Sequence, residues 1–394
     1  MVEPPDEVVR HRPPVCHQCH ADLSGVAGRV AERRQVLDLP EIRLRAQEHQ
    51  SEAICCPNCH TISTGSFPAA VSAPVQYGPH MQALAVYLHQ GQLLPTARTC
   101  EALAAICGCQ IAEATLIQWS QLAAERLAPT VERIADLIAA SGLQHGDETG
   151  IRVYGMLHWL HVNCTRFLTH LAWHESRGRP AMDEIGIWPR FSGRGMHDRL
   201  ASYDGYDCAH SICGAHLVRD CAAVGEQEHQ QWAMEMHDFL LDLHDACHQW
   251  RLLHLSAVPP IERDDWVARY FEILAAGYAA QPPPPPSSAG SRKGKPKQSQ
   301  AKNLLDALLG RAEQVLALLD DLRIPFTNNQ AERDLRWAKV QQKISGTFRS
   351  ATGLTAFCRI RSYLSTMRKQ GHPMLSALTA VFHGQPLPVA WTPE

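Results

Sequence analysis

Three carboxylate side chains lie in or beside predicted strands and helices, in positions where a charged group usually needs a partner or a cation. Asp147 lies inside a predicted strand, Asp198 lies at the end of another, and Glu332 lies at the start of a predicted helix. An acid inside a strand of an α/β sheet is costly unless it is paired or binds a cation. Carboxylate oxygens suit Mg²⁺ or Mn²⁺, and two such ions can activate a nucleophile and stabilise the leaving oxygen of a phosphodiester. Taken singly, each acid is more often a surface or capping residue, so their joint placement carries the argument.

Neighbouring acids compete for two of these positions. Asp204 and Asp207 lie close to Asp198 in the sequence. Glu148 directly follows Asp147, but in a regular strand it points to the opposite face of the sheet.

Two Cys-x-x-Cys pairs near the start of the chain could hold a zinc ion. They are separated by 36 residues, and each pair supplies two thiolates on one tight turn. Residues 36–40 and 42–45 between the pairs are predicted to form short strands around a turn. We therefore predict a zinc ribbon over residues 16–66; the alternative is reduced, free cysteines on loops. The four predicted Zn²⁺ ligands are Cys16, Cys19, Cys56 and Cys59.

A second group of cysteine and histidine side chains lies just after Asp198. It consists of Cys208, His210, Cys213 and His216. These four could hold a second zinc ion, or they could pack in the core and orient nearby groups. The sequence leaves both possibilities open.

The elements that position these residues follow from the hydrophobic pattern. Apolar residues recur at three- and four-residue steps over residues 77–141, which predicts helices at 96–107 and 112–126. The joint at 108–110 contains a glycine, as in a helix-turn-helix, so the second helix could enter a major groove of DNA. The alternative is a helical hairpin that packs on the next domain.

The pattern changes to strands from residue 142. Strands are predicted at 143–153, 156–163 and 167–173, then around 195–198 and at 210–213, with a helix near 180–187. Strands alternating with helices over residues 142–221 predict an α/β layer fold.

The later part of the chain divides by composition. Residues 222–322 are predicted to be mostly helical, interrupted at 281–302 by an extended linker rich in proline and lysine. The remaining segments are residues 323–371, which contain Glu332, a C-terminal tail at 372–394, and a Pro-rich, disordered N-terminus at 1–15.

Residues 323–371 are strongly basic. They contain ten Lys or Arg against two acids, in a chain whose net charge is −3. This local excess favours a polyanion-facing surface over an ordinary solvated helix face, which usually mixes both signs. The predicted DNA-binding residues are Arg333, Arg336, Lys339, Lys343 and Arg349. Nearby, Asn328 and Asn329 could cap a helix or contact the DNA strand that is cut, and capping alone is the expectation. Trp337 is expected to pack in the core rather than to stack on a base.

Composition excludes several classes of protein. The chain has 394 residues, 45% of them apolar and 20% charged, which is a globular composition with room for two or three domains. No apolar run approaches the length of a membrane span, and the N-terminus does not resemble a secretory signal. We therefore expect a soluble protein of the cytoplasm, without membrane partners, whose fourteen cysteines bind metal or lie in the core.

The motifs around the acids resemble those of DDE transposases of the insertion sequence 66 family. The C-terminal motifs are the most specific, and the similarity covers nearly the whole chain. The matching segments are residues 325–336, 339–346, 348–350 and 357–364, with 146–149, 197–198, 206–208 and 213–219 upstream. Because the Tyr-Asp-Cys at 206–208 matches a position downstream of the second acid, the resemblance favours Asp198 over Asp207.

The resemblance implies an RNase H-like catalytic core with three attached parts. Residues 142–221 and 323–371 would form the core, and residues 222–322 would be a helical insertion. The zinc ribbon and the helix-turn-helix-like domain would precede it. Asp147, Asp198 and Glu332 would be the catalytic triad and the ligands of Mg²⁺ or Mn²⁺.

The function implied is a DNA transposase that binds the terminal repeats of its own element and catalyses metal-dependent cleavage and strand transfer. Its partners would be terminal-repeat and target DNA, a second copy of the chain, and small accessory proteins of the same element, at the bacterial nucleoid. Family members commonly carry a longer region before the ribbon. The alternatives are therefore a truncated or domesticated DNA-binding protein without strand transfer, and a stand-alone RNase H-like nuclease.

Overall fold

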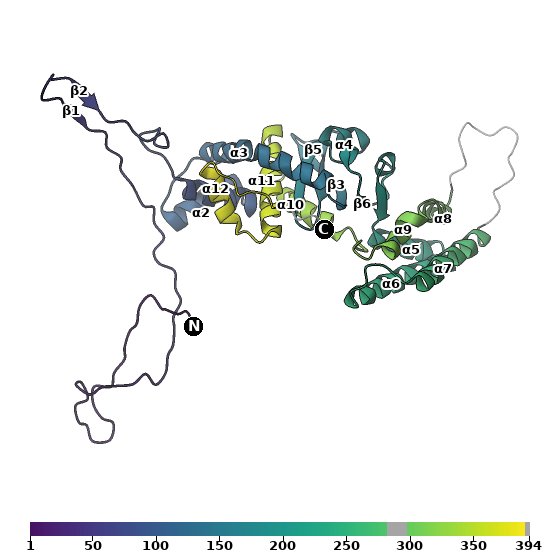
Figure 1. Cartoon of the computed structure of the whole chain (residues 1–394), viewed down its shortest axis with the longest axis horizontal. Coiled ribbons are helices and arrows are strands. Elements are labelled where there is room, and N and C mark those ends of the chain that lie inside the picture. Colours follow the sequence, from purple (N-terminus) through teal and green to yellow (C-terminus); the bar gives the residue numbers. More distant parts are fainter. Residues whose placement is uncertain (282–297, 391–394) are drawn as a thin grey trace.

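A five-stranded mixed sheet forms the centre of the molecule. The computed structural model describes residues 1–281 and 298–390 (Figure 1). The strand order is β5-β4-β3-β6-β7, in which β3, β4 and β5 are antiparallel and β3, β6 and β7 are parallel. The strands are β3 (Leu143–Val153), β4 (Met156–Cys164), β5 (Thr169–His174), β6 (Arg194–His197) and β7 (Ala209–Ile212). The predicted mixed α/β fold is confirmed, and this sheet is consistent with an RNase H-like DDE core.

The two faces of the sheet are covered differently. Ile151 and Val153 of β3 pack against helices α10 (Asn329–Ser345) and α11 (Ala351–Lys369) in one apolar cluster. On the other face, the indole of Trp188 lies over Gly146 and Gly195, leaving no room there for a Cβ atom. A short helix, α4 (Arg179–Ile185), and the 3₁₀ turn η2 (Trp188–Arg190), which contains Trp188, cover this second face of the sheet.

The N-terminal helices pack with the last ones. The helix predicted at 96–107 is α2 (Thr96–Cys107), which ends at Gly108 in a left-handed conformation. The following helix, α3 (Glu113–Ala139), is 27 residues long and passes through Pro129, well beyond the predicted end at residue 126. Helices α1 (Pro79–Val86), α3, α11 and α12 (Met374–Phe382) share one buried cluster. The helical block at 77–141 therefore packs on the C-terminal helices, and part of the segment 372–394 is a helix. A short π-helical turn, η1 (Tyr87–Gly91), follows α1.

Five helices between β7 and α10 form a second apolar cluster. They are α5 (Gly214–Gln227), α6 (Gln231–Leu252), α7 (Pro260–Ala279), α8 (Gln300–Gly310) and α9 (Ala312–Asp320). Helix α9 packs against β7, and the two ends of the segment meet where Gly214 N–H donates to Phe326 O (2.8 Å). The helical stretch predicted after the linker, up to residue 322, is thus two helices, α8 and α9. Most of the predicted linker, residues 282–297, lies outside the described residues, and its last residues open α8.

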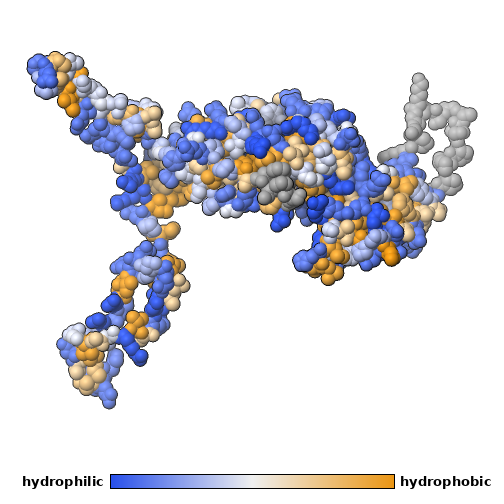
Figure 2. Space-filling view, viewed as in Figure 1, coloured by the Kyte–Doolittle hydropathy of each residue, from blue (hydrophilic) through white to orange (hydrophobic). Residues whose placement is uncertain are grey.

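The first 70 residues extend away from this body (Figures 1 and 2). Their regular structure is a hairpin of β1 (Ala53–Cys55) and β2 (Ile62–Thr64), with a bridge between Val15 and Asp22. The strands predicted at 36–40 and 42–45 are wrong: these residues are irregular, and Val36 and Leu37 are 92% and 78% exposed. No layer packs against them, so they gain nothing from pairing. None of the described helices is long and apolar enough to span a bilayer.

Candidate active site

Adjacent parallel strands place Asp147 and Asp198 at the same level. In the β3–β6 ladder His145 is opposite Met196, so two residues further on Asp147 is level with Asp198, the first residue after β6. Side chains alternate along a strand, and Asp147 therefore shares the face of Ile151, which packs on α10 and α11. The first acid faces the helix that carries Glu332.

Glu332 lies in the first turn of α10, and a buried asparagine fixes that turn to β3. The side chain of Asn328 donates from Nδ2 to Gly146 O (2.8 Å), and its Oδ1 accepts from His145 Nδ1 (2.9 Å). It makes no side-chain cap of α10, so the predicted capping role of Asn328 is wrong. Glu332 N–H donates to Asn328 O (3.2 Å), which ties the third acid to the strand of the first.

The acids influence one another electrostatically. Burial first, and then the negative charges of Glu148, Asp198 and Glu332, together raise the pKa of Asp147 to about 7, against a hydrogen bond from Glu148 N–H that lowers it. Each of these charges disfavours a second negative charge nearby. The donor set is thus hard oxygen with excess negative charge, which fits a divalent cation such as Mg²⁺.

The Glu148 carboxylate is hydrogen-bonded and ion-paired on the face of the sheet opposite to Asp147, as expected. Its carboxylate accepts from Tyr203 Oη (2.8 Å) and is paired with Arg177 (2.8 Å), and Tyr203 lies against Gly146 beneath the sheet. Burial raises the pKa of Glu148. Arg177 also lies 4.0 Å from Asp198. These partners occupy Glu148 and leave Asp147 as the acid on the α10 face.

The two competitors of Asp198 have other surroundings. Asp204 pairs with Arg311 at the start of α9, and Asp207 is exposed. Their positions favour Asp198 as the second acid.

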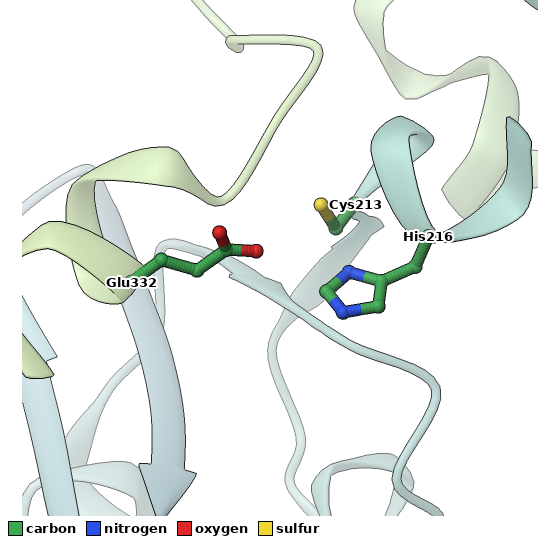
Figure 3. A group of neighbouring side chains, drawn as sticks. All are labelled: Cys213, His216 and Glu332. Carbon is green, nitrogen blue, oxygen red and sulfur yellow. The ribbon is translucent and has the colours of Figure 1, made fainter. Parts of the chain in front are cut away.

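Glu332 also faces two residues of α5. The ligand atoms of Cys213, His216 and Glu332 lie within 4.8 Å of one another (Figure 3). No other such group of three occurs among the residues described, so Cys208 and His210 do not join Cys213 and His216. His210 instead contacts His197 (2.9 Å between Nδ1 and Nε2). A four-ligand second zinc site, which the sequence left open, is not assembled among the described residues.

The two Cys-x-x-Cys pairs form turns of the same geometry. In each turn the first cysteine, Cys16 or Cys56, accepts a backbone hydrogen bond from a histidine four residues on, His20 or His60. Both histidines have a φ near +57° (57° and 56°). Backbone N–H groups of the turn lower the pKa of Cys16, as suits a thiolate ligand. The turns lie on separate arms (Figure 1), and the structure does not bring the four sulfurs together.

The comparison with known protein families identifies the family of the chain. Residues 74–356, more than two-thirds of the chain, match the model of the transposase IS66 family. The chain belongs to this family. No curated protein sequence matches it. The matched region of this IS66 family transposase contains all three acids, Asp147, Asp198 and Glu332, and DDE transposases of this kind use a divalent metal and bind DNA.

The basic side chains of the transposase line the exposed side of α10 and the segment after it. All five predicted DNA-binding residues are exposed, and within residues 1–281 and 298–390 none of the five forms an ion pair. Arg336, Lys339 and Lys343 follow Glu332 at steps of four, seven and eleven, which places them along one face of the helix with it. The five exposed residues are Arg333, Arg336, Lys339, Lys343 and Arg349.

The acid and the aromatic residue of this segment point inward. Asp334 is buried and paired with Lys369 (2.8 Å), so it does not offset the exposed charge. Trp337 packs beneath the guanidinium groups of Arg361 (4.2 Å from the ring centroid) and Arg368 (5.2 Å), as expected for a core residue.

Sequence reasoning missed the positioning residues of the site. Asn328 bonds to a strand more than 180 residues away, and Arg177 lies between Glu148 and Asp198. Both contacts join segments that are far apart in sequence, so no local sequence pattern predicts them. The one available signal for Asn328 was its place four residues before Glu332, inside the family motif.

Proposed function

We propose that this transposase cleaves DNA at the terminal repeats of its element and joins the freed ends to target DNA. The single observation that carries the proposal is the placement of the three acids: Asp147 and Asp198 are level on adjacent parallel strands, and Glu332 lies in the first turn of the helix that packs on the Asp147 face. Burial, together with the charges of Glu148, Asp198 and Glu332, raises the pKa of Asp147 to about 7. Among the described residues, the ligand atoms of the three acids do not form a group within 4.8 Å of one another. The fold of residues 142–221 and 323–371 is proposed to be an RNase H-like core, with residues 222–322 as a helical insertion.

The three acids would hold Mg²⁺ or Mn²⁺, which supplies Lewis-acid activation of a nucleophile and stabilisation of the leaving oxygen. A cation held beside Asp147 would favour the ionised form of its carboxyl group, because a nearby positive charge lowers the pKa of an acid. Arg177 holds Glu148 away from the Asp147 face. Asn328 holds the first turn of α10, and with it Glu332, against β3.

DNA would lie along the exposed basic face of α10. Arg336, Lys339 and Lys343 lie on the Glu332 side of that helix and have no acidic partner among the described residues. A phosphate backbone placed on them would pass the three acids. Repeat recognition is proposed for α2–α3 and the zinc ribbon, with Cys16, Cys19, Cys56 and Cys59 as Zn²⁺ ligands. Joining two ends requires at least a dimer on DNA, and accessory proteins of the element are proposed partners.

The test is cleavage and joining of labelled DNA carrying the flanking repeats of the element, with Mg²⁺ or Mn²⁺. We expect Asp198→Asn to lower the cleavage rate at least about 1,000-fold, because a metal site of this kind supplies several kcal/mol of transition-state stabilisation. Asp207→Asn is the matched control, since Asp207 is exposed nearby and should leave the rate within about threefold of wild type.

Three other outcomes would contradict the proposal. If both variants cleave as wild type does, the triad assignment is wrong. If wild-type protein binds the repeats but never cleaves them, with the accessory proteins present, the chain is a DNA-binding protein without strand transfer. Cleavage without joining would indicate a nuclease.

A further inference from the structure

Cys213, His216 and Glu332 form a compact group beside the three acids. Cys213 is the N-cap of α5, His216 lies in the first turn of that helix, and Glu332 lies in the first turn of α10. One ligand atom from each lies within 4.8 Å of the other two. Figure 3 shows the thiol, the imidazole and the carboxylate turned toward a common space.

One of these side chains has a buried polar atom without a partner, and another is itself fully buried. His216 Nδ1 is buried and has no hydrogen-bond partner, which is costly for an imidazole unless something binds the nitrogen. Cys213 is fully buried, and its sulfur accepts the backbone N–H of Asn328 (3.2 Å).

We propose that Cys213, His216 and Glu332 bind one Zn²⁺ ion. Thiolate, imidazole and carboxylate are the three ligand types that zinc takes, and three protein ligands leave a fourth position open to water. The set differs from the all-oxygen set of the catalytic acids, because sulfur and nitrogen donors select zinc over Mg²⁺. The site goes beyond the proposed function, although Glu332 belongs to both.

A zinc ion at this position would join two ends of the fold. It would bind the N-terminus of α5, which follows β7, to the first turn of α10. The same two segments already meet through the hydrogen bond from Gly214 N–H to Phe326 O. The ion would therefore fix Glu332 relative to the sheet and stabilise the folded chain.

The test uses the full chain with the four ribbon cysteines changed to serine, so that the ribbon takes up no metal. Co²⁺ is the probe, because thiolate ligation gives a charge-transfer band. We expect one equivalent of Co²⁺ to bind with the band of a single thiolate and to be displaced by Zn²⁺. Cys213→Ser should abolish the band, and His216→Ala should weaken binding at least about 100-fold, since even outer partners of metal ligands are worth 10–100-fold.

Cys208→Ser is the matched control, because Cys208 lies five residues away and outside the group. It should leave the band unchanged. A band that survives Cys213→Ser, is lost with Cys208→Ser, or never forms in the ribbon-free chain would overturn the proposal. A second measurement covers misfolding: Zn²⁺ should raise the thermal unfolding midpoint of the ribbon-free chain but not of its Cys213→Ser variant. Neither measurement involves DNA, so failure here leaves the cleavage proposal untouched.

Discussion

Asn328 offers the sharpest test of how the acidic site is held together. Its side chain makes two buried hydrogen bonds, from Nδ2 to Gly146 O and from His145 Nδ1 to Oδ1. Burial lowers the pKa of His145 to about 4, so the ring is neutral near pH 7 and its Nδ1–H is the donor. Asn328→Ala removes both bonds and leaves a buried N–H and a buried carbonyl without these partners.

The magnitude follows from those contacts. Each neutral hydrogen bond contributes about 0.5–1.5 kcal/mol, and each group left unsatisfied costs about 1–3 kcal/mol. We expect Asn328→Ala to lower the free energy of unfolding by about 2–4 kcal/mol, measured by urea denaturation. Cleavage should fall while repeat binding is retained, because the variant frees the turn that carries Glu332.

Asn329→Ala is the control, since Asn329 is the next residue, of the same type, and exposed. It should change stability by less than about 0.5 kcal/mol. If Asn328→Ala is as stable as Asn329→Ala, the two hydrogen bonds do not hold α10 on β3 and the argument for Asn328 fails.

Three further predictions concern stability. Asp334→Ala should cost about 3–5 kcal/mol in chemical denaturation, because it leaves the Lys369 ammonium, whose side chain is 12% exposed, without its counter-charge and with only backbone carbonyl partners. Gly146→Ala should cost about 1–3 kcal/mol, because its Cβ would lie 2.5 Å from the indole of Trp188. Burial lowers the pKa of His161 from 6.5 to about 4, so the unfolded chain takes up this proton first as the pH falls. The stability present above pH 6.5 should decline by up to about 3 kcal/mol by pH 4, followed by urea titrations at several pH values.

Each of these three stability predictions has its own control variant. Asp245→Ala removes an exposed aspartate and should be nearly neutral. Gly310→Ala adds a Cβ with nothing within 4 Å, so equal costs at Gly310 and Gly146 would contradict the steric argument. His161→Gln should reduce the acid dependence between pH 6.5 and 4 by the His161 share, leaving the part due to the buried His145, His170 and His197, whose pKa values burial also lowers. An unchanged slope would assign the whole dependence to those other groups.

Much of the fold could be predicted because the local signals agree. The helix at 96–107 ends at Gly108, which adopts the left-handed conformation that glycine favours at a helix end. The hairpin of β3 and β4 turns at Tyr154 and Gly155, both with positive φ, so a glycine marked its position. Propensity and turn chemistry indicated the same boundaries in these segments.

The predictions that were wrong share one physical cause: they depended on whether distant segments of the chain pack together, which the local sequence does not show. Residues 36–40 have the apolar character of a strand, but no layer covers them and they stay irregular. Helix α3 continues through Pro129 because packing along α11 outweighs the cost of the proline. Cys213 was grouped with its sequence neighbour Cys208, whereas its partner in space is Glu332, more than 100 residues later.

The pairing of the first helices with the last has a consequence for synthesis. Helix α1 packs on α12, about 300 residues further along the chain. At about 5–20 residues per second, a ribosome needs roughly 15–60 s to make the second surface after the first. For that interval the sides of α1 and α3 that pack on α11 and α12 have no native cover, so the nascent chain depends there on chaperones or on temporary contacts. The central sheet, whose strands are made close together, can form earlier, and DNA chemistry must wait until α10 through α12 have left the ribosome.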